Sequence, residues 1–157
     1  MLKEIPFFSS LNEHELTKLE EISVVKKYKK GEMLFLEGEE PQWLSILLKG
    51  RLKIYKTNPK GKEIFLHEIR PINMIAELVN FEEMRYPASS IFVSNGEILR
   101  INYHKFKALF IDNPTILFEL LKSISDKLKR MNEIFIREIV LDSEEKVAKY
   151  ICENFEA

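Results

Sequence analysis

Cysteine is nearly absent from this sequence of 157 residues, since Cys152 is the only one. A single thiol cannot form a disulfide within the chain and cannot supply the four thiolates of an iron–sulfur cluster. An excess of one charge is also lacking, because 24 Lys and Arg residues face 25 Asp and Glu residues and leave a formal charge of −1. We therefore do not expect a protein that binds nucleic acid by electrostatic attraction alone.

Long apolar runs are missing as well. No stretch approaches the roughly 18 apolar residues needed to span a bilayer, and residues 1–8 lack a basic segment followed by an apolar signal core. We expect a cytoplasmic protein with no membrane partner. The composition, 45% hydrophobic and 31% charged, is that of a globular domain, and the chain is long enough to bury one core.

Glycine is scarce, and all five glycines lie between residues 31 and 96, where apolar residues recur with a period of two. This pattern predicts short strands separated by turns. Asn95-Gly96 is the strongest signal for a tight hairpin. Many short strands favour a closed roll, which leaves few exposed edges. The predicted strands are Met33–Leu36, Leu44–Leu48, Leu52–Thr57, Glu63–Ile69, Ser89–Val93 and Ile98–Ile101.

Helical patterns flank the strands. Residues 9–24 predict a short amphipathic helix, in which Ser10 and Glu13 have the spacing of a capping box. A second short helix is predicted from Tyr103 to Phe110. Asn113-Pro114 then begins a long helix, because Asn is a good cap and Pro is tolerated in the first turn. If this helix continues to Leu141, it is roughly 42 Å long at 1.5 Å per residue.

The long helix carries an apolar seam whose residues alternate by four and three positions, as in a coiled coil. A small roll cannot cover its whole length, so we predict a parallel homodimer in which the seams of two copies pack together. The alternative is that the stripe packs on the strands of its own chain. The predicted seam residues are Leu117, Leu121, Ile124, Leu128, Met131 and Phe135.

The seam is interrupted at Glu138, and the pair Asp142-Ser143 follows. Asp142 and Glu145 have capping-box spacing, which predicts a break and a new helix. The expected organisation is therefore a sensing domain over 1–112, a dimerisation helix over 113–141, and a hinge with the start of a C-terminal segment over 142–157. The apolar face predicted for the new helix consists of Val147, Ala148, Ile151 and Phe155.

Several fragments occur in an order and spacing typical of one protein family. They are Pro6–Leu11, Lys30–Glu32, Glu37–Glu39 and Lys49–Tyr55. The chain resembles the N-terminal sensor half of the Crp/Fnr superfamily of bacterial transcription regulators. This resemblance implies an α+β fold, in which a double-stranded β-helix of the cyclic-nucleotide-binding type, a cupin-like jelly roll, is flanked by helices. It also implies effector sensing, homodimers, and DNA binding through a helix-turn-helix domain that is absent from these 157 residues.

The effector cassette departs from the family pattern. Members that bind cyclic nucleotides have a Gly before Glu-Leu and, ten residues after the Glu, an Arg that pairs with the phosphate. Here Glu77 and Leu78 are kept, but Ala76 replaces the Gly and Pro87, which has no charge and no amide donor, stands in place of the Arg. Losing such a contact costs about 1.5–3 kcal/mol. We therefore do not expect cyclic AMP or cyclic GMP to bind in the usual manner. The candidate effector-binding residues are Ile75, Ala76, Glu77, Leu78, Arg85, Pro87, Ala88, Ser89, Met131 and Asn132.

Two other classes of protein compete with this reading. A cupin-type enzyme needs a metal, but His14, His67 and His104 are far apart without ligand spacing, and we expect no metal site, no catalytic residues and no enzyme. His67 is a candidate haem ligand, since some family members sense gases through haem, although a strand histidine also fits a surface role. A ligand-free dimerisation module is the third possibility, with the roll filled by Met74, Phe81 and Met84. The effector stays unidentified.

Overall fold

The computed structural model describes residues 2–155 and divides into two units, one that ends at Pro114 and one that begins at Thr115. The first unit contains all the strands and the short helices, and the second is helical. In chain order the elements are η1 (Leu2–Glu4), η2 (Pro6–Phe8), α1 (Glu13–Glu21), β1 (Ser23–Tyr28), β2 (Met33–Phe35), β3 (Trp43–Lys49), β4 (Leu52–Thr57), β5 (Glu63–Ile69), β6 (Asn73–Ile75), α2 (Glu77–Phe81), β7 (Ser89–Phe92), β8 (Gly96–Asn102), α3 (Tyr103–Phe110) and α4 (Pro114–Phe155).

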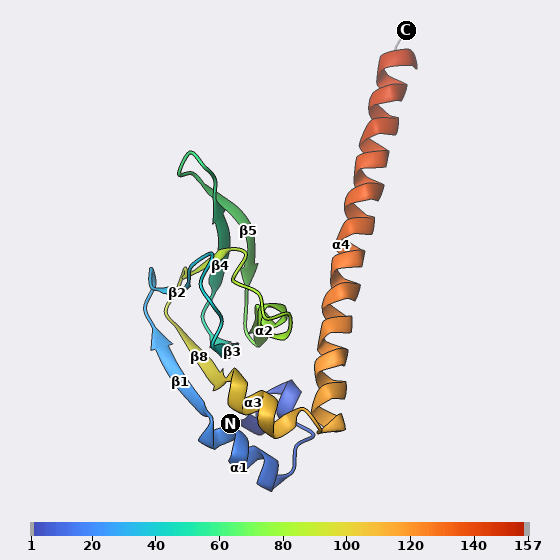
Figure 1. Ribbon diagram of the computed structural model, residues 1–157. Helices are drawn as coiled ribbons and strands as arrows, with labels where there is room; N and C mark the ends of the chain where they lie inside the picture. The colour runs from blue at the N-terminus through green and yellow to red at the C-terminus, as the bar shows by residue number, and fades with distance from the viewer. Residues whose placement is uncertain (1, 156–157) are drawn as a thin grey trace. The chain divides into compact units, whose positions relative to one another are not determined.

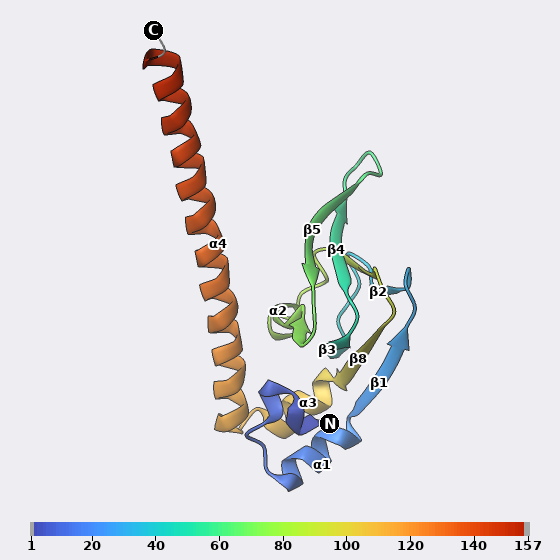
Figure 2. The same cartoon turned by 180° about the vertical axis from the view of Figure 1, so that it is seen from behind.

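The strands form two four-stranded sheets, with the orders β1-β8-β3-β6 and β2-β7-β4-β5. All neighbouring strands are antiparallel. Helices α1 and α3 lie at one end of the roll, near the N-terminus, and the β4–β5 hairpin extends beyond the other strands (Figures 1 and 2). This architecture confirms the predicted fold class of a jelly-roll-like β domain with helices.

The central strands are buried on both faces. Ile46 and Leu47 are adjacent in β3, and Ile98 and Leu99 are adjacent in β8, yet none of the four is more than 1% exposed. Neighbouring strand residues point to opposite faces, so this sheet is covered on both sides. Between the two sheets lies an apolar cluster, here named the roll core. It consists of Tyr28, Phe35, Leu47, Leu52, Ile54, Ile75, Val79, Tyr86, Ala88, Phe92 and Ile98.

Strand prediction succeeded for six of the eight strands, and the observed ends of β2, β3, β7 and β8 lie within two residues of the predicted ones. Strands β4 and β5 have the predicted bounds, whereas β1 and β6 were missed. The hairpin predicted at Asn95-Gly96 is wrong, because β7 and β8 belong to different sheets. Glycine is needed at position 96 because Lys49 and Phe92 lie close to its backbone. A Cβ there would lie 2.5 Å from the Lys49 carbonyl oxygen and 2.5 Å from Cε1 of Phe92.

The first helix begins later than predicted. Its capping box is formed by Asn12 and Glu15, with the Glu15 N–H donating to Oδ1 of Asn12 (3.0 Å) and the Asn12 N–H donating to Oε2 of Glu15 (2.9 Å). The predicted cap at Ser10 is wrong, because Leu11 still belongs to the preceding turn. Its N–H donates to the Phe8 carbonyl and its side chain is buried, which places the helix start after it.

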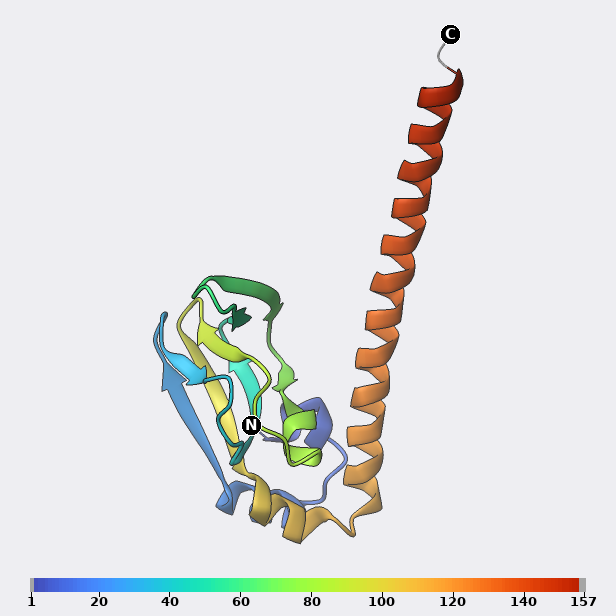
Figure 3. The same ribbon diagram turned by 45° about the horizontal axis from the view of Figure 1, so that its top comes forward.

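Helix α4 begins at Pro114, as predicted from Asn113-Pro114. It then continues through Asp142-Ser143 to Phe155 without the predicted break (Figure 3). Asp and Ser lower helix propensity by only a few tenths of a kcal/mol each, and no Gly or Pro follows Pro114 to stop the helix. The side chains of residues 138–144 and 146–157 lie outside the described residues, so the apolar face predicted from Val147 onward stays a prediction, as does the domain division at 141/142.

Within residues 2–155, none of the helices combines the length and the apolar character that crossing a bilayer requires.

Candidate functional site

The predicted effector loop joins β6 to α2. Ala76, at the start of α2, has φ 50° and ψ 38°, which is the left-handed conformation. Glycine adopts this conformation freely, whereas a residue with a Cβ is strained there by about 1–2 kcal/mol. The backbone thus has the geometry that suits the Gly of cyclic-nucleotide-binding members, although the residue is alanine.

The four residues of this loop point in different directions. Ile75 belongs to the roll core and Ala76 packs against it. Glu77 is buried at 5% exposure, but Leu78 is 54% exposed. The loop therefore presents one apolar side and one buried carboxyl group to the interior, while Leu78 faces outward.

Arg85 is held on the outside of the roll. Its Nη1 donates to the Gly38 carbonyl oxygen at 3.0 Å, and its Nη2 pairs with Oε1 of Glu40 at 2.5 Å. Both partners lie in the turn between β2 and β3. Pro87, at the position where the family has its phosphate-binding Arg, is exposed. A guanidinium group is therefore not supplied to the roll core by either residue.

The remaining candidates divide between the two units. Ala88 belongs to the roll core, and Oγ of Ser89 accepts a hydrogen bond from the Glu37 N–H at 2.9 Å. Met131 and Asn132 are exposed residues of α4, in the second unit. Of the ten predicted effector residues, the structure thus brings together Ile75, Ala76 and Ala88 at the roll core.

Aromatic stacks occupy the roll core. The rings of Phe35 and Tyr86 are parallel with centroids 3.8 Å apart, and those of Tyr28 and Phe92 stack at 4.6 Å. Met74, Phe81 and Met84, which were expected to fill the roll in the ligand-free alternative, are not members of this cluster. Met84 is instead about half exposed, because it lies in the loop that follows α2.

One hydroxyl group in this region lacks a partner. Alternation along β7 places Ser90 on the same face as Ala88 and Phe92, which belong to the roll core. Its side chain is fully buried, and Oγ has no hydrogen-bond partner among the residues that the structure describes. A buried hydroxyl group without a partner costs about 1–3 kcal/mol.

A hollow of about 470 Å³ opens at the end of the roll next to the Phe35–Tyr86 stack. Trp43 and Arg100 line it, and the Arg100 Cζ lies 4.6 Å from the centre of the Trp43 ring. Burial raises the pKa of Tyr86 to about 12, while the nearby Arg100 charge acts in the opposite direction. Tyr86 is therefore a neutral phenol at physiological pH.

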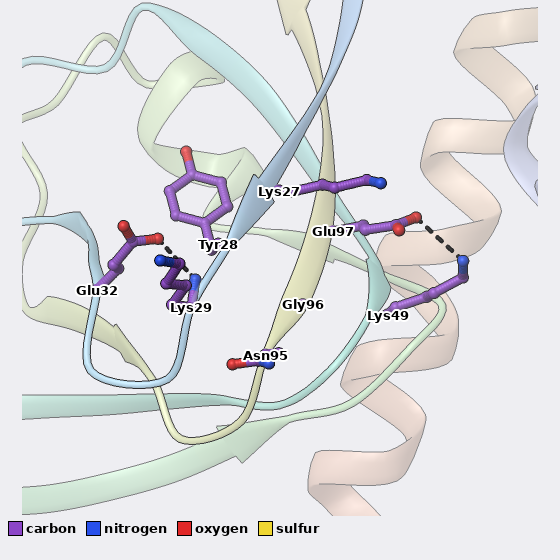
Figure 4. A pocket seen from close by; sticks show the side chains of 8 residues that line it. All are labelled: Lys27, Tyr28, Lys29, Glu32, Lys49, Asn95, Gly96 and Glu97. Atoms are coloured by element: carbon purple, nitrogen blue, oxygen red, sulfur yellow. Dashed lines mark hydrogen bonds and ion pairs between the residues drawn. The ribbon is translucent and has the colours of Figure 1, made fainter.

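A second hollow, of about 450 Å³, lies between the first turn of the roll and the start of β8 (Figure 4). Lysines contribute to it, but its polar groups hold the surrounding turns. Lys49 Nζ pairs with Oε2 of Glu97 at 3.2 Å, and the Lys29 N–H donates to Oε2 of Glu32 at 2.6 Å. We therefore assign this hollow a structural role.

The histidines that could hold a metal ion or haem are dispersed over three elements. In the part of the chain that the structure describes, no three His, Cys, Asp or Glu side chains come close enough together to hold a metal ion. His67 is exposed on β5, which is an edge strand. His14 and His104 lie on α1 and α3, separate from this strand.

The seam of α4 is exposed in the single chain. Leu117, Leu121, Leu128, Met131 and Phe135 are 45–66% exposed, and Ile124 is half-buried. At 100° per residue the six positions fall within an arc of about 80°, so they form one straight stripe.

A two-sheet β-roll with a left-handed turn before a short helix defines the class of cyclic-nucleotide-binding-type domains. The family model for the cyclic nucleotide-binding domain matches residues 25–113, and the chain belongs to this family, as a sensor domain of the Crp/Fnr type.

Two relatives by sequence are named as regulators. The chain is 33% identical over 124 residues to the anaerobic regulatory protein of Bacillus subtilis, covering 78% of this chain and 52% of the relative. It is 26% identical over 126 residues to the CRP-like cAMP-activated global transcriptional regulator of Mycobacterium tuberculosis, covering 80% of this chain and 56% of that protein. The chain thus spans about half the length of the curated relatives it matches.

Solved structures agree with this assignment. The sensor domain of the transcriptional regulator DNR from Pseudomonas aeruginosa matches with a TM-score of 0.70 and 27% identity, covering 84% of this chain and 89% of that domain. A second structure of DNR matches with a TM-score of 0.72 and 23% identity, covering 99% of this chain and 70% of the other, which supports the fold alone.

Sequence reasoning missed the residues around the end of the roll, namely Trp43, Tyr86 and Arg100. One signal was available. Arg100 interrupts the apolar run Ile98–Ile101 of β8, and a charged residue within a buried strand indicates a special environment. Its stacking on Trp43 depends on pairing between β3 and β8, which are distant in sequence, so the partner was not visible.

Proposed function

We propose that this chain is the effector-sensing and dimerisation region of a Crp/Fnr-type transcription regulator, and that it acts on DNA through a helix-turn-helix domain outside these 157 residues. The observation that carries the proposal is the order of parts: a β-roll of the cyclic-nucleotide-binding family is followed by a 42-residue helix with an exposed apolar seam. A regulatory role, rather than catalysis, is supported by relatives named as an anaerobic regulatory protein and as a global transcriptional regulator.

The seam is the surface that we assign to the dimer. Two α4 helices in parallel place equivalent apolar residues opposite each other, which removes both stripes from water. A ligand that favours one packing of the roll over another shifts the populations of the dimer's states by its difference in affinity. In this proposal the helices carry that shift towards the DNA-binding domain.

The effector that we propose is not a cyclic nucleotide held in the usual way. Pro87 offers no charge, and the Arg85 guanidinium group is already engaged by Glu40 and the Gly38 carbonyl. Isothermal titration calorimetry with cyclic AMP and cyclic GMP should therefore give no saturable heat. Saturable binding of either nucleotide that is weakened by Glu77→Gln would show that the family's usual site works here and would overturn this part of the proposal.

The regulatory role is tested by a chimera. Residues 1–157 are joined to the helix-turn-helix domain of a Crp/Fnr regulator, and transcription from that regulator's promoter is measured. We expect promoter control by the chimera and loss of control when the seam carries Leu128→Glu. A chimera that is folded and dimeric but never alters transcription would contradict the proposal.

The ligand-free dimerisation module is a second candidate function, favoured by one observation. The two aromatic stacks occupy the roll core with the protein's own side chains. Native mass spectrometry of the purified protein distinguishes the candidates. A small molecule retained by the folded dimer supports sensing. A mass equal to that of the protein alone, together with no heat of binding in calorimetry with benzoate, supports the module.

A further inference from the structure

Arg100 stands apart from the other charged groups at the open end of the roll. Arg85 and Glu40 form an ion pair with each other, and Oε2 of Glu39 accepts a hydrogen bond from the Leu36 N–H at 3.0 Å. Among the side chains that the structure describes, no carboxylate forms an ion pair with Arg100, and its Nε has no hydrogen-bond partner. The lining of this hollow therefore has one positive charge whose acceptor is missing.

The position of Arg100 is set by the sheet. Alternation along β8 places its side chain on the same face as Ile98, a member of the roll core, and alternation along β3 places Trp43 on the same face as Leu47. The Arg100 Cζ lies over the Trp43 ring, 4.6 Å from its centre, in a cation–π contact, and Arg100 is half-buried. The ring therefore restrains the guanidinium group from one side.

The chemistry of the hollow selects a class of ligand. A carboxylate has two oxygens that match two N–H donors of one guanidinium group, and a charge-assisted pair of this kind is among the stronger polar contacts in proteins. The remaining walls combine the rings of Phe35, Trp43 and Tyr86, which suit a flat ring, with Leu34, Gln42 and the charged side chains of Glu39, Glu40 and Arg85. The volume of about 470 Å³ accommodates a small molecule.

We propose that the hollow at the open end of the roll binds a small planar carboxylate, with Arg100 as its anion-binding residue and Trp43 and Tyr86 as its aromatic walls. The proposal deepens the proposed function by giving the effector a site and a chemical class, and it rests on that function only for the consequence of binding. Because Tyr86 stacks on Phe35 in the roll core, a ligand here contacts the same stack that fills the roll.

The test uses Trp43, the only tryptophan of the chain, as a reporter. Benzoate is the probe, and benzamide is its neutral counterpart of nearly the same shape. We expect benzoate at low salt to change the Trp43 fluorescence saturably and benzamide to cause no saturable change. Arg100→Gln should weaken benzoate binding by roughly tenfold to hundredfold, the value of one charge-assisted contact.

Two further variants keep the test decisive. Arg70→Gln removes an exposed arginine that pairs with Glu68 and should leave benzoate binding unchanged. Arg100→Lys keeps the charge but not the flat donor edge, so its affinity should fall between those of the wild type and Arg100→Gln. Thermal melts confirm that each variant is folded.

Three outcomes overturn the inference: no saturable response to benzoate up to about 10 mM, an equal response to benzamide, or equal affinity in folded Arg100→Gln. Each of these concerns binding in the roll alone. A negative benzoate result therefore does not contradict the proposed dimer or the promoter experiment. A negative result with the chimera, in turn, does not contradict benzoate binding.

Discussion

The proposed dimer depends on Leu128, near the middle of the α4 seam. Its side chain is 55% exposed in the single chain. Leu128→Glu places a carboxylate where the equivalent residue of the second helix must lie. Lys129→Glu is the matched control, since it introduces the same group one position along the helix, on an exposed site that is turned about 100° away from the seam.

The size of the effect follows from burial. Complete burial of a leucine side chain contributes about 1.5–3 kcal/mol, so covering the exposed half of Leu128 contributes about 1–1.5 kcal/mol in each copy. A symmetric dimer counts this contribution twice, which gives about 2–3 kcal/mol. Since 1.4 kcal/mol corresponds to a factor of ten, the dissociation constant should rise by about 30-fold to 100-fold from the lost apolar contact alone. Two facing carboxylates increase it further.

Sedimentation velocity over a range of protein concentrations measures this change. We expect the wild type and Lys129→Glu to sediment as dimers at concentrations where Leu128→Glu sediments as a monomer. Circular dichroism should show similar secondary structure in all three, because a single Leu to Glu change costs little intrinsic helix propensity.

The reasoning is refuted if Leu128→Glu dimerises as tightly as the wild type, because the seam then does not form the interface. It is equally refuted if the wild type is monomeric throughout the concentration range. Equal weakening by Leu128→Glu and Lys129→Glu would show that net charge, and not the seam, controls assembly.

Two predictions concern the stability of the roll and are checked by urea unfolding. Gly50 and Gly61 both have positive φ, but only at Gly50 would a Cβ meet backbone, 2.5 Å from the Asn95 carbonyl oxygen. Gly61→Ala should cost about 1–2 kcal/mol, and Gly50→Ala clearly more; equal losses would contradict the close approach. Asn12→Ala should cost about 1 kcal/mol by removing the helix cap, and Ser10→Ala less than about 0.5 kcal/mol. The reverse order would mean that Ser10 is the cap.

Prediction from sequence worked best for signals that are local. The bounds of β4 and β5, the Tyr103–Phe110 helix and the start of the long helix at Pro114 were all predicted at the observed residues. The errors occurred where two signals competed. Ser10 and Asn12 are both good caps, and burial of Leu11 decided between them, while Asp142-Ser143 offered a cap that the continuing helix does not use.

The candidate site was predictable only in part. The loss of the family's phosphate-binding Arg at Pro87 could be predicted from the sequence, because proline lacks both a charge and an N–H group. The role of Arg85 was not, because its partners Gly38 and Glu40 are more than 40 positions away in the sequence. Sequence spacing carries no record of such long-range partners.

By itself, the sequence determined the class of this protein: its periodicities specify a glycine-punctuated roll and a long amphipathic helix, and its motifs specify the family. The tertiary structure alone decided which side chains meet. Folding brought Trp43 beneath Arg100 and stacked Tyr86 on Phe35. Local patterns arise from neighbours along one strand or helix, whereas these contacts arise from the register between strands that are distant in the chain.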